Sequence, residues 1–111
     1  MTTRAGALEA IDRILNRGGD ADDVLRAVLR ALNDRGISYA AIRFNEDGRL
    51  VDGPSAGERS DAKTTPIVYR GELVGELELS DDDPAFAQRV ATVISAYVLV
   101  GWDTSGEPWA S

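Results

Sequence analysis

Residues 65–79 read TPIVYRGELVGELEL, and this stretch decides the fold. Two runs rich in branched and aromatic residues flank Arg70, Gly71 and Glu72, where the glycine can take the positive φ of a tight reversal. The stretch therefore predicts a β-hairpin. Its second strand alternates in polarity, so one face should turn to the core while the other tolerates water. The core face is Leu73, Gly75, Leu77 and Leu79, and the other face is Val74, Glu76 and Glu78.

A helix is expected after the hairpin, beginning at Asp81-Asp82-Asp83-Pro84. Aspartate is a favoured helix N-cap, and proline is favoured at the first helical position. Apolar residues then recur at helical spacing and can cover the core face of the hairpin. They are Phe86, Val90, Val93, Ile94 and Tyr97. Clustered carboxylates also suit Ca²⁺ or Mg²⁺, but no EF-hand glycine and distal glutamate accompany these, so we interpret them as a cap.

Two amphipathic helices are expected before the hairpin. The first runs from Ala7 and ends at Arg17-Gly18-Gly19, because glycine terminates helices. Asp20 is a good N-cap for the second helix, the acidic residues after it favour the positive end of the helix dipole, and Gly36 closes the helix. An Arg-Gly-Gly trio also occurs in nucleic-acid-binding segments, but a single copy between two helices is typical of a joint.

A strand from Ser38 to Phe44 is expected next, with alternating faces. Ala40, Ile42 and Phe44 share one face, and Tyr39, Ala41 and Arg43 share the other. The sequence NEDG at 45–48 predicts a hairpin turn, after which residues 49–51 should pair back on that strand. Residues 52–62 are rich in glycine, serine and charged residues, so we expect an irregular segment with room for one short edge strand.

Length and charge restrict the class of protein. A chain of 111 residues fits one domain, which we assign to residues 1–100, followed by a tail at 101–111. A net charge of −7 opposes phosphate backbones, so nucleic-acid binding is not expected. No apolar run reaches the about 20 residues that cross a membrane, and no secretory signal is visible. We therefore expect a cytoplasmic protein that does not bind membranes.

The chain contains neither histidine nor cysteine. Without cysteine there are no disulfides, thiolate nucleophiles or cysteine-ligated metals. Without histidine there is neither the usual general base near neutral pH nor the commonest metal ligand. The sequence therefore predicts no catalytic residue, no metal site and no cofactor.

The element order, together with Pro66-Ile67-Val68, Gly71 and Leu73-Val74-Gly75-Glu76-Leu77, resembles the GAF domain family of small-molecule-binding signalling modules. The resemblance spans about Leu8 to Tyr97. It implies an α+β, profilin-like fold, in which a mostly antiparallel sheet carries the N- and C-terminal helices on one face. In ligand-binding relatives it also implies a pocket on the other face, under a lid of loops and short helices. Gly75, on the core face of its strand, would let a helix approach closely.

The sequence departs from ligand-binding GAF domains in three ways. The segment Asp52 to Thr64, which corresponds to the lid, is short and rich in small residues. The cysteines with which relatives attach bilin chromophores or reduce free methionine sulfoxide are absent. The Asn-Lys-x-x-x-Phe-x-x-x-Asp-Glu pattern of cyclic-nucleotide-binding members is absent too. No ligand-binding residue therefore carries over by motif.

Candidate ligand-binding residues follow from the family topology, which places the strand of Arg43 beside the strand of Glu76 and Glu78. These charges would share the sheet face away from the helices. They could form a polar ligand floor, with Arg43 gripping a carboxylate or phosphate. The alternative is a set of cross-strand ion pairs on a wet sheet face. The full candidate set is Tyr39, Arg43, Val68, Glu76 and Glu78.

The segment 93–100 is apolar on nearly all sides and needs more cover than one sheet face provides. We therefore expect a homodimer through the terminal helices. The residues expected at its interface are Leu8, Ile11, Leu15, Ile94, Tyr97 and Val98. Trp102 is expected to pack against its own domain or the dimer mate, and the alternative is that the tail with Trp109 serves as a docking peptide.

Three function classes remain open at this point. The first is a non-catalytic regulatory and signalling module, with an unidentified small molecule as a candidate ligand. The second is a ligand-free dimerisation or scaffold module, similar in use to roadblock-like or PAS-like domains. The third is an enzyme, and the lack of histidine and cysteine argues against it.

Overall fold

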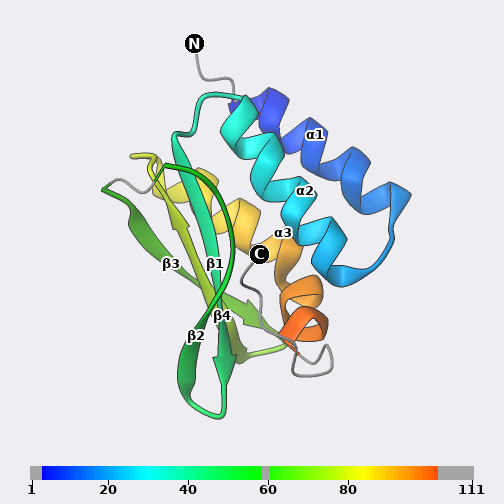
Figure 1. Ribbon diagram of the computed structural model, residues 1–111, viewed down its shortest axis with the longest axis vertical. Helices are drawn as coiled ribbons and strands as arrows, with labels where there is room; N and C mark the ends of the chain where they lie inside the picture. The colour runs from blue at the N-terminus through cyan, green and yellow to red at the C-terminus, as the bar shows by residue number, and fades with distance from the viewer. Residues whose placement is uncertain (1–3, 59–60, 103–111) are drawn as a thin grey trace.

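The chain folds into a four-stranded antiparallel sheet and a layer of helices (Figure 1). The computed structural model describes residues 4–58 and 61–102. The elements follow one another in the predicted order, two helices, two hairpins and a helix. They are α1 (Arg4–Arg17), α2 (Ala21–Asp34), β1 (Tyr39–Glu46), β2 (Arg49–Gly57), β3 (Lys63–Tyr69), β4 (Glu72–Leu79) and α3 (Pro84–Trp102).

The two hairpins lie side by side, which gives the strand order β2-β1-β4-β3. Both turns have positive φ at their two central residues, 53° and 85° at Asp47 and Gly48, and 52° and 82° at Arg70 and Gly71. This is the backbone that matches the twist of the flanking strands. The sequence predictions of both turns are confirmed.

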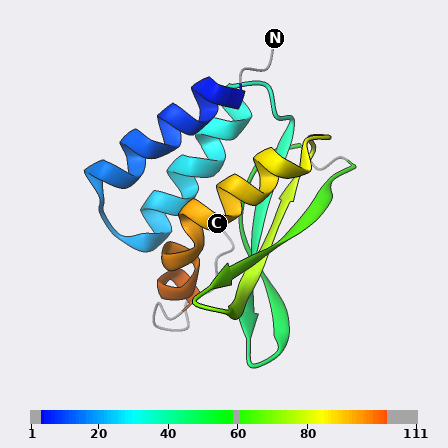
Figure 2. The same cartoon turned by 180° about the vertical axis from the view of Figure 1, so that it is seen from behind.

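Helices α2 and α3 pack on one face of the sheet, and α1 packs on α2. Helix α2 contacts β1 and β2, α3 contacts β3, β4 and β1, and the two helices contact each other. Helix α1 packs on α2, and the two views in Figures 1 and 2 show the helices on the same side of the strands. The predicted α+β arrangement of helices on an antiparallel sheet is confirmed, with α3 in contact with the strands and α1 packed on α2.

The core lies between the sheet and α2 and α3. From β1 it takes Ala40, Ile42 and Phe44, which are all 0–1% exposed. Aliphatic side chains of the other strands and of the helices complete one continuous cluster. These include Leu25, Leu29, Leu32, Ile67, Leu77, Leu79, Val90 and Ile94.

The predicted alternation of β4 is wrong at its start. Leu73, expected in the core, is 44% exposed, whereas Val74, expected on the outer face, is buried. The register explains this, because Ile67 pairs with Gly75 and Val68 pairs with Leu73, which leaves Val74 without a partner on β3. Val74 is thus the extra residue of a β-bulge, which breaks the period of two and reverses the faces before it.

The segment predicted to be irregular is mostly strand. Strand β2 continues to Gly57, and β3 already begins at Lys63. Between the pairs Arg43–Asp52 and Ala41–Ser55, β2 has one residue more than β1, so a second bulge lies at its glycine and proline, residues 53–54. Both residue types weaken a strand prediction, yet both occur at bulges and edge strands, and β2 is an edge strand.

Helix α3 ends at Trp102, inside the predicted tail. The expectations about the Trp102 side chain and about Trp109 lie outside the described residues. No helix in the described part of the chain is both long and apolar enough to cross a membrane.

Candidate functional site

The structure brings the predicted charged residues together on the sheet face away from the helices. Arg43 on β1 is the register partner of Glu76 on β4, and Glu78 lies opposite the neighbouring Ala41. The Arg43 guanidinium contacts Glu78, with Nη2 3.1 Å from Oε1, and Asp52 of β2, with Nε 3.5 Å from Oδ1. The guanidinium is therefore already engaged by carboxylates from both neighbouring strands.

The burial of the Arg43–Glu78 pair affects what it can bind. The two side chains are 29% and 13% exposed, so the pair is partly shielded from water. An anionic ligand would compete with Glu78 for the Arg43 guanidinium, and less with Asp52, whose side chain is 94% exposed. The geometry is thus that of cross-strand ion pairs, and ligand binding at Arg43, Glu76 and Glu78 stays a prediction.

Tyr39 and Val68 differ in what they offer to a ligand. Tyr39 is only 6% exposed, and its backbone amide donates to Oγ of Ser80 at 2.8 Å. Val68 is 45% exposed and pairs with Leu73 across the β3–β4 hairpin. Of these two candidates, Val68 is therefore the one with surface available for contact.

A pocket of about 620 Å³ lies at the end of the sheet where α1 begins. Its volume falls within the roughly 300–1,000 Å³ of small-molecule sites, although it is open to solvent. It lies between the start of α1, the start of β3 and the loop from β4 to α3. Its polar lining includes Arg4, Asp61, Lys63, Ser80, Asp81 and Asp82.

An ion-pair network joins α1 to the β4–α3 loop at this pocket. Arg4 donates from Nη2 to Oδ1 of Asp81 at 2.8 Å and from Nε to Oδ2 at 3.1 Å, while Asp83 lies 3.5 Å from Nε. Hydrogen bonding from the Arg4 guanidinium lowers the pKa of Asp81 against the opposing effect of desolvation. The same hydrogen bond raises the pKa of Arg4.

The three aspartates before α3 differ in their main contacts, although Asp81 and Asp83 both lie near Arg4. Oδ1 of Asp83 accepts hydrogen bonds from the amides of Ala85 at 3.1 Å and Phe86 at 3.2 Å, which confirms the predicted N-cap. Asp81 pairs with Arg4, and Asp82 lies 3.4 Å from Nζ of Lys63. The three carboxylates therefore do not act as one cluster.

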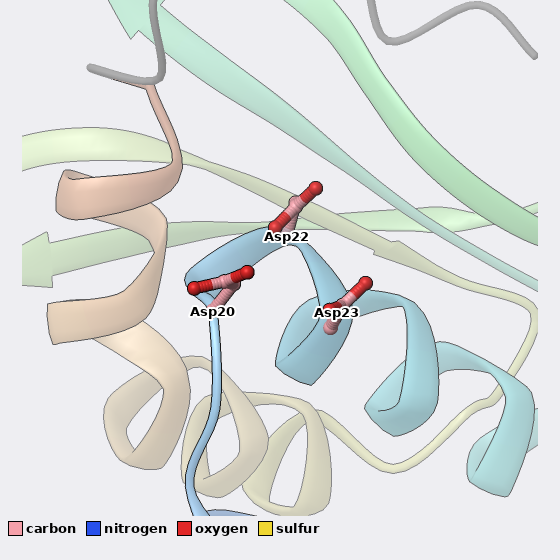
Figure 3. Close-up of side chains that lie close together, drawn as sticks. All are labelled: Asp20, Asp22 and Asp23. Carbon is pink, nitrogen blue, oxygen red and sulfur yellow. The ribbon is translucent and has the colours of Figure 1, made fainter.

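A tighter acidic cluster occurs at the start of α2. Ligand oxygens of Asp20, Asp22 and Asp23 lie within 4.8 Å of one another (Figure 3). Asp20 has N-cap backbone angles (φ −65°, ψ 144°), and its carbonyl accepts from the amide of Val24 at 2.9 Å, but its side chain makes no capping hydrogen bond. Carboxylates at a helix N-terminus are stabilised by the helix dipole, which accounts for the cluster without a cation.

A smaller groove lies at the opposite end of the sheet, beside the two hairpin turns. We call it the hairpin groove. It measures about 170 Å³ and is lined by Asn45, Asp47, Glu72, Leu73, Val74 and Leu99. Sequence reasoning missed it because the alternation of β4 places Leu73 in the core, and only the bulge turns that side chain outward.

The residues predicted for a dimer interface pack in or against the core of their own chain. Ile11, Ile94 and Val98 are 0% exposed. Leu8, Leu15 and Tyr97 are half-buried and pack against the same cluster. Only these last three therefore offer surface to a second copy, and the homodimer stays a prediction.

Comparison with known proteins identifies the fold. No protein-family model and no curated protein matches the chain. A GAF domain of a Coxiella burnetii phosphoenolpyruvate-protein phosphotransferase superposes with a TM-score of 0.69 at 14% identity, over 87% of this chain and 95% of its own. A GAF domain of the corresponding Acinetobacter protein gives 0.68 at 12% identity, over 91% and 97%.

A third solved structure is an enzyme. It is a type II free methionine-R-sulfoxide reductase from Thermoplasma acidophilum, with a TM-score of 0.61 at 15% identity, over 70% of this chain and 92% of its own. Identities this low carry information about the fold alone. The chain therefore has the fold of a GAF domain, as the hairpin sequence and element order predict.

Proposed function

We propose that the chain is a non-catalytic regulatory and signalling module of GAF fold, acting in the cytoplasm through contacts with other proteins. The observation that carries this proposal is the partly shielded ion pair between Arg43 and Glu78 of its own sheet, 3.1 Å apart, which occupies one side of the guanidinium. In a sheet-face ligand site this cation would be the group that grips an anion. Its engagement favours the ligand-free module over the small-molecule sensor.

The residue inventory supports the absence of catalysis. One structural neighbour is a free methionine-R-sulfoxide reductase, and the GAF resemblance implies cysteine as the reductant in such relatives. This chain has no cysteine to supply the thiolate, and no histidine to act as a general base near neutral pH.

Native mass spectrometry of the protein purified from its own host tests the proposal. We expect a dimer of the chain, with or without a protein partner, and no retained small molecule. A stoichiometric small molecule that survives gentle desolvation and leaves on heating would contradict the ligand-free function. The same spectrum reports the oligomeric state.

A small-molecule sensor is the second candidate, and the 620 Å³ pocket at the start of α1 favours it. Both charge signs line this pocket, so it would suit a polar, zwitterionic compound. A thermal-shift screen with polar metabolites, repeated on Arg4→Gln and Arg43→Gln, locates such a site. Loss of a ligand-induced rise in Tm in Arg4→Gln alone assigns the pocket. Loss in Arg43→Gln alone assigns the predicted set on the sheet face instead.

We also propose that the module is a homodimer through α1 and α3. Leu8, Leu15 and Tyr97 support this, because these apolar side chains of α1 and α3 remain only partly buried against the core. A shallow, largely apolar hollow of about 170 Å³, lined by Gly19, Ala21, Ala96 and Tyr97, lies on the layer of helices. A second copy could fill it with an apolar side chain.

A further inference from the structure

We propose that the hairpin groove binds a protein segment in which one large apolar side chain is flanked by lysine or arginine. The inference rests on the proposed function as a protein-contact module, and it specifies the surface and the chemistry of the partner. The apolar anchor would enter between Leu73 and Leu99, and the basic residues would meet Asp47 and Glu72.

Exposed aliphatic side chains gather around this groove. Leu73 and Leu99, in its walls, are 44% and 40% exposed. Val68, 45% exposed, is the register partner of Leu73. Of the four exposed large hydrophobic residues in the described part of the chain, two therefore line the groove and a third pairs with one of them. Apolar surface gathered in one place and rimmed by polar residues marks an interaction site more often than scattered exposure does.

The dimensions and walls of the groove suit a single side chain. Its volume of about 170 Å³ lies below the roughly 300–1,000 Å³ of pockets for drug-sized ligands. Asn45 fixes two of its walls, because its Nδ2 donates to the carbonyl of Leu73 at 2.8 Å while its Oδ1 accepts from the amide of Gly48 at 3.1 Å. A groove held in this way needs little ordering when a partner binds.

The charge of the groove selects the partner. Its two ionisable lining residues, Asp47 and Glu72, are both acidic, and neither forms an ion pair within residues 4–58 and 61–102. The whole chain carries −7, which attracts basic segments over a longer range. The acidic lining of the groove disfavours a second copy of this acidic chain at this site. It also disfavours the chain's own tail, residues 103–111, whose ionisable side chains are both acidic.

Selection from a random twelve-residue peptide display library on the immobilised full chain tests the proposal. We expect enrichment of peptides with an aromatic or large aliphatic residue between lysines or arginines. Fluorescence anisotropy of the best enriched peptide then reports Kd. Leu73→Ser and Leu99→Ser should each weaken binding at least about fivefold, as expected for exposed walls of an anchor pocket. Asp47→Asn combined with Glu72→Gln should weaken it about tenfold at low salt and flatten its salt dependence.

Matched controls are available in the same chain. Leu50→Ser alters an aliphatic side chain as exposed as Leu99 that does not line the groove, and it should leave Kd unchanged. Glu9→Gln with Asp12→Asn removes the same number of charges from α1, and it should change Kd less than about twofold. Far-UV circular dichroism and Tm establish that each variant is folded.

Each remaining outcome overturns the proposal. Failure to enrich any peptide, enrichment without basic residues, or equal sensitivity to Leu50→Ser and Leu73→Ser would exclude the partner described here. Stronger peptide binding by Trp109→Ser, by more than about fivefold, would show that the chain's own tail fills the groove. Conversion of a dimer to a monomer by Leu73→Ser would assign the groove to a second copy. None of these results depends on the small molecule that would contradict the proposed function.

Discussion

At the scale of single residues, Gly75 lies where β4, β1 and α3 approach one another closely. A Cβ atom added at Gly75 would collide with the carbonyl oxygen of Arg43 on β1 and would lie 3.0 Å from Cγ1 of Val98 on α3. The predicted close approach of a helix to this glycine is thereby confirmed. The sequence could indicate this because glycine weakens a strand interior, and at a core position it often marks the close approach of another backbone.

Gly75→Ala should destabilise the domain by about 1–3 kcal/mol, because the β1 backbone cannot yield without breaking sheet hydrogen bonds. Urea denaturation followed by circular dichroism measures the change. Gly71→Asn is the matched control, since Gly71 lies in the turn of the same hairpin with φ +82° and no atom near its Cβ position. Asparagine tolerates that backbone, so a loss as large as that of Gly75→Ala would refute the steric explanation.

Asp81 should make the stability of the domain depend on pH. Its folded-state pKa is lowered by Arg4, so the pair stabilises the fold above the unfolded-state pKa of about 3.9. This contribution is lost as the pH falls through the folded-state pKa. The Tm difference between the wild type and Asp81→Asn should therefore be largest near neutral pH and shrink in acid. A difference that stays constant from neutral pH to pH 2 would argue against the pair.

At the scale of elements, two bulges decide which side chains face outward. The bulge at Val74 places that residue and Gly75 in the interior and leaves Leu73 outside. The bulge in β2 allows a glycine and a proline within a nine-residue edge strand. Neither bulge follows from alternation, because one extra residue preserves the local hydrophobic composition while reversing the faces beyond it.

Strict alternation predicts that Leu73→Ala costs more unfolding free energy than Val74→Ala. Because of the bulge, we expect the opposite. Removing two buried methyl groups at Val74 should cost about 2 kcal/mol of unfolding free energy. Leu73→Ala, at an exposed site, should cost no more than about 0.5 kcal/mol. Chemical denaturation of both variants in parallel decides the matter, and a larger loss for Leu73→Ala would place the bulge elsewhere.

At the scale of the whole molecule, the proposed homodimer depends on the apolar side chains of α1 and α3 that are not fully buried. The buried residues Ile11, Ile94 and Val98 already complete the core of one chain. A dimer through α1 and α3 would thus use the half-buried Leu8, Leu15 and Tyr97, and its interface would differ from the hairpin groove.

Size-exclusion chromatography with light scattering should give twice the chain mass of 11.9 kDa at micromolar concentration. Leu8→Gln should shift the protein toward the monomer, because it puts a polar amide into the apolar interface. Leu73→Ser and Leu99→Ser should leave the mass unchanged. A clean monomer of the wild type under these conditions would rule out the homodimer.

The candidate sites show where sequence reasoning succeeds and where it fails. Arg43, Glu76 and Glu78 could be predicted as neighbours, because the family topology and strand alternation together place them on adjacent strands. The pairing of Arg4 with Asp81, 77 positions apart, has no local signal in the sequence. The hairpin groove likewise needs the turn of β1–β2, the start of β4 and the last turns of α3 to meet.

The sequence by itself determined the order of the elements, both hairpin turns and the cap at Asp83. These depend on local propensity, on glycine in positive-φ turns and on hydrophobic period, which are properties of neighbouring residues. Only the tertiary structure decided that Leu73 faces water and that the Arg43 guanidinium pairs with a carboxylate of a neighbouring strand. It also decided where the pockets lie. These depend on register and on contacts between distant segments, where one extra residue in a strand changes the face on which a side chain lies.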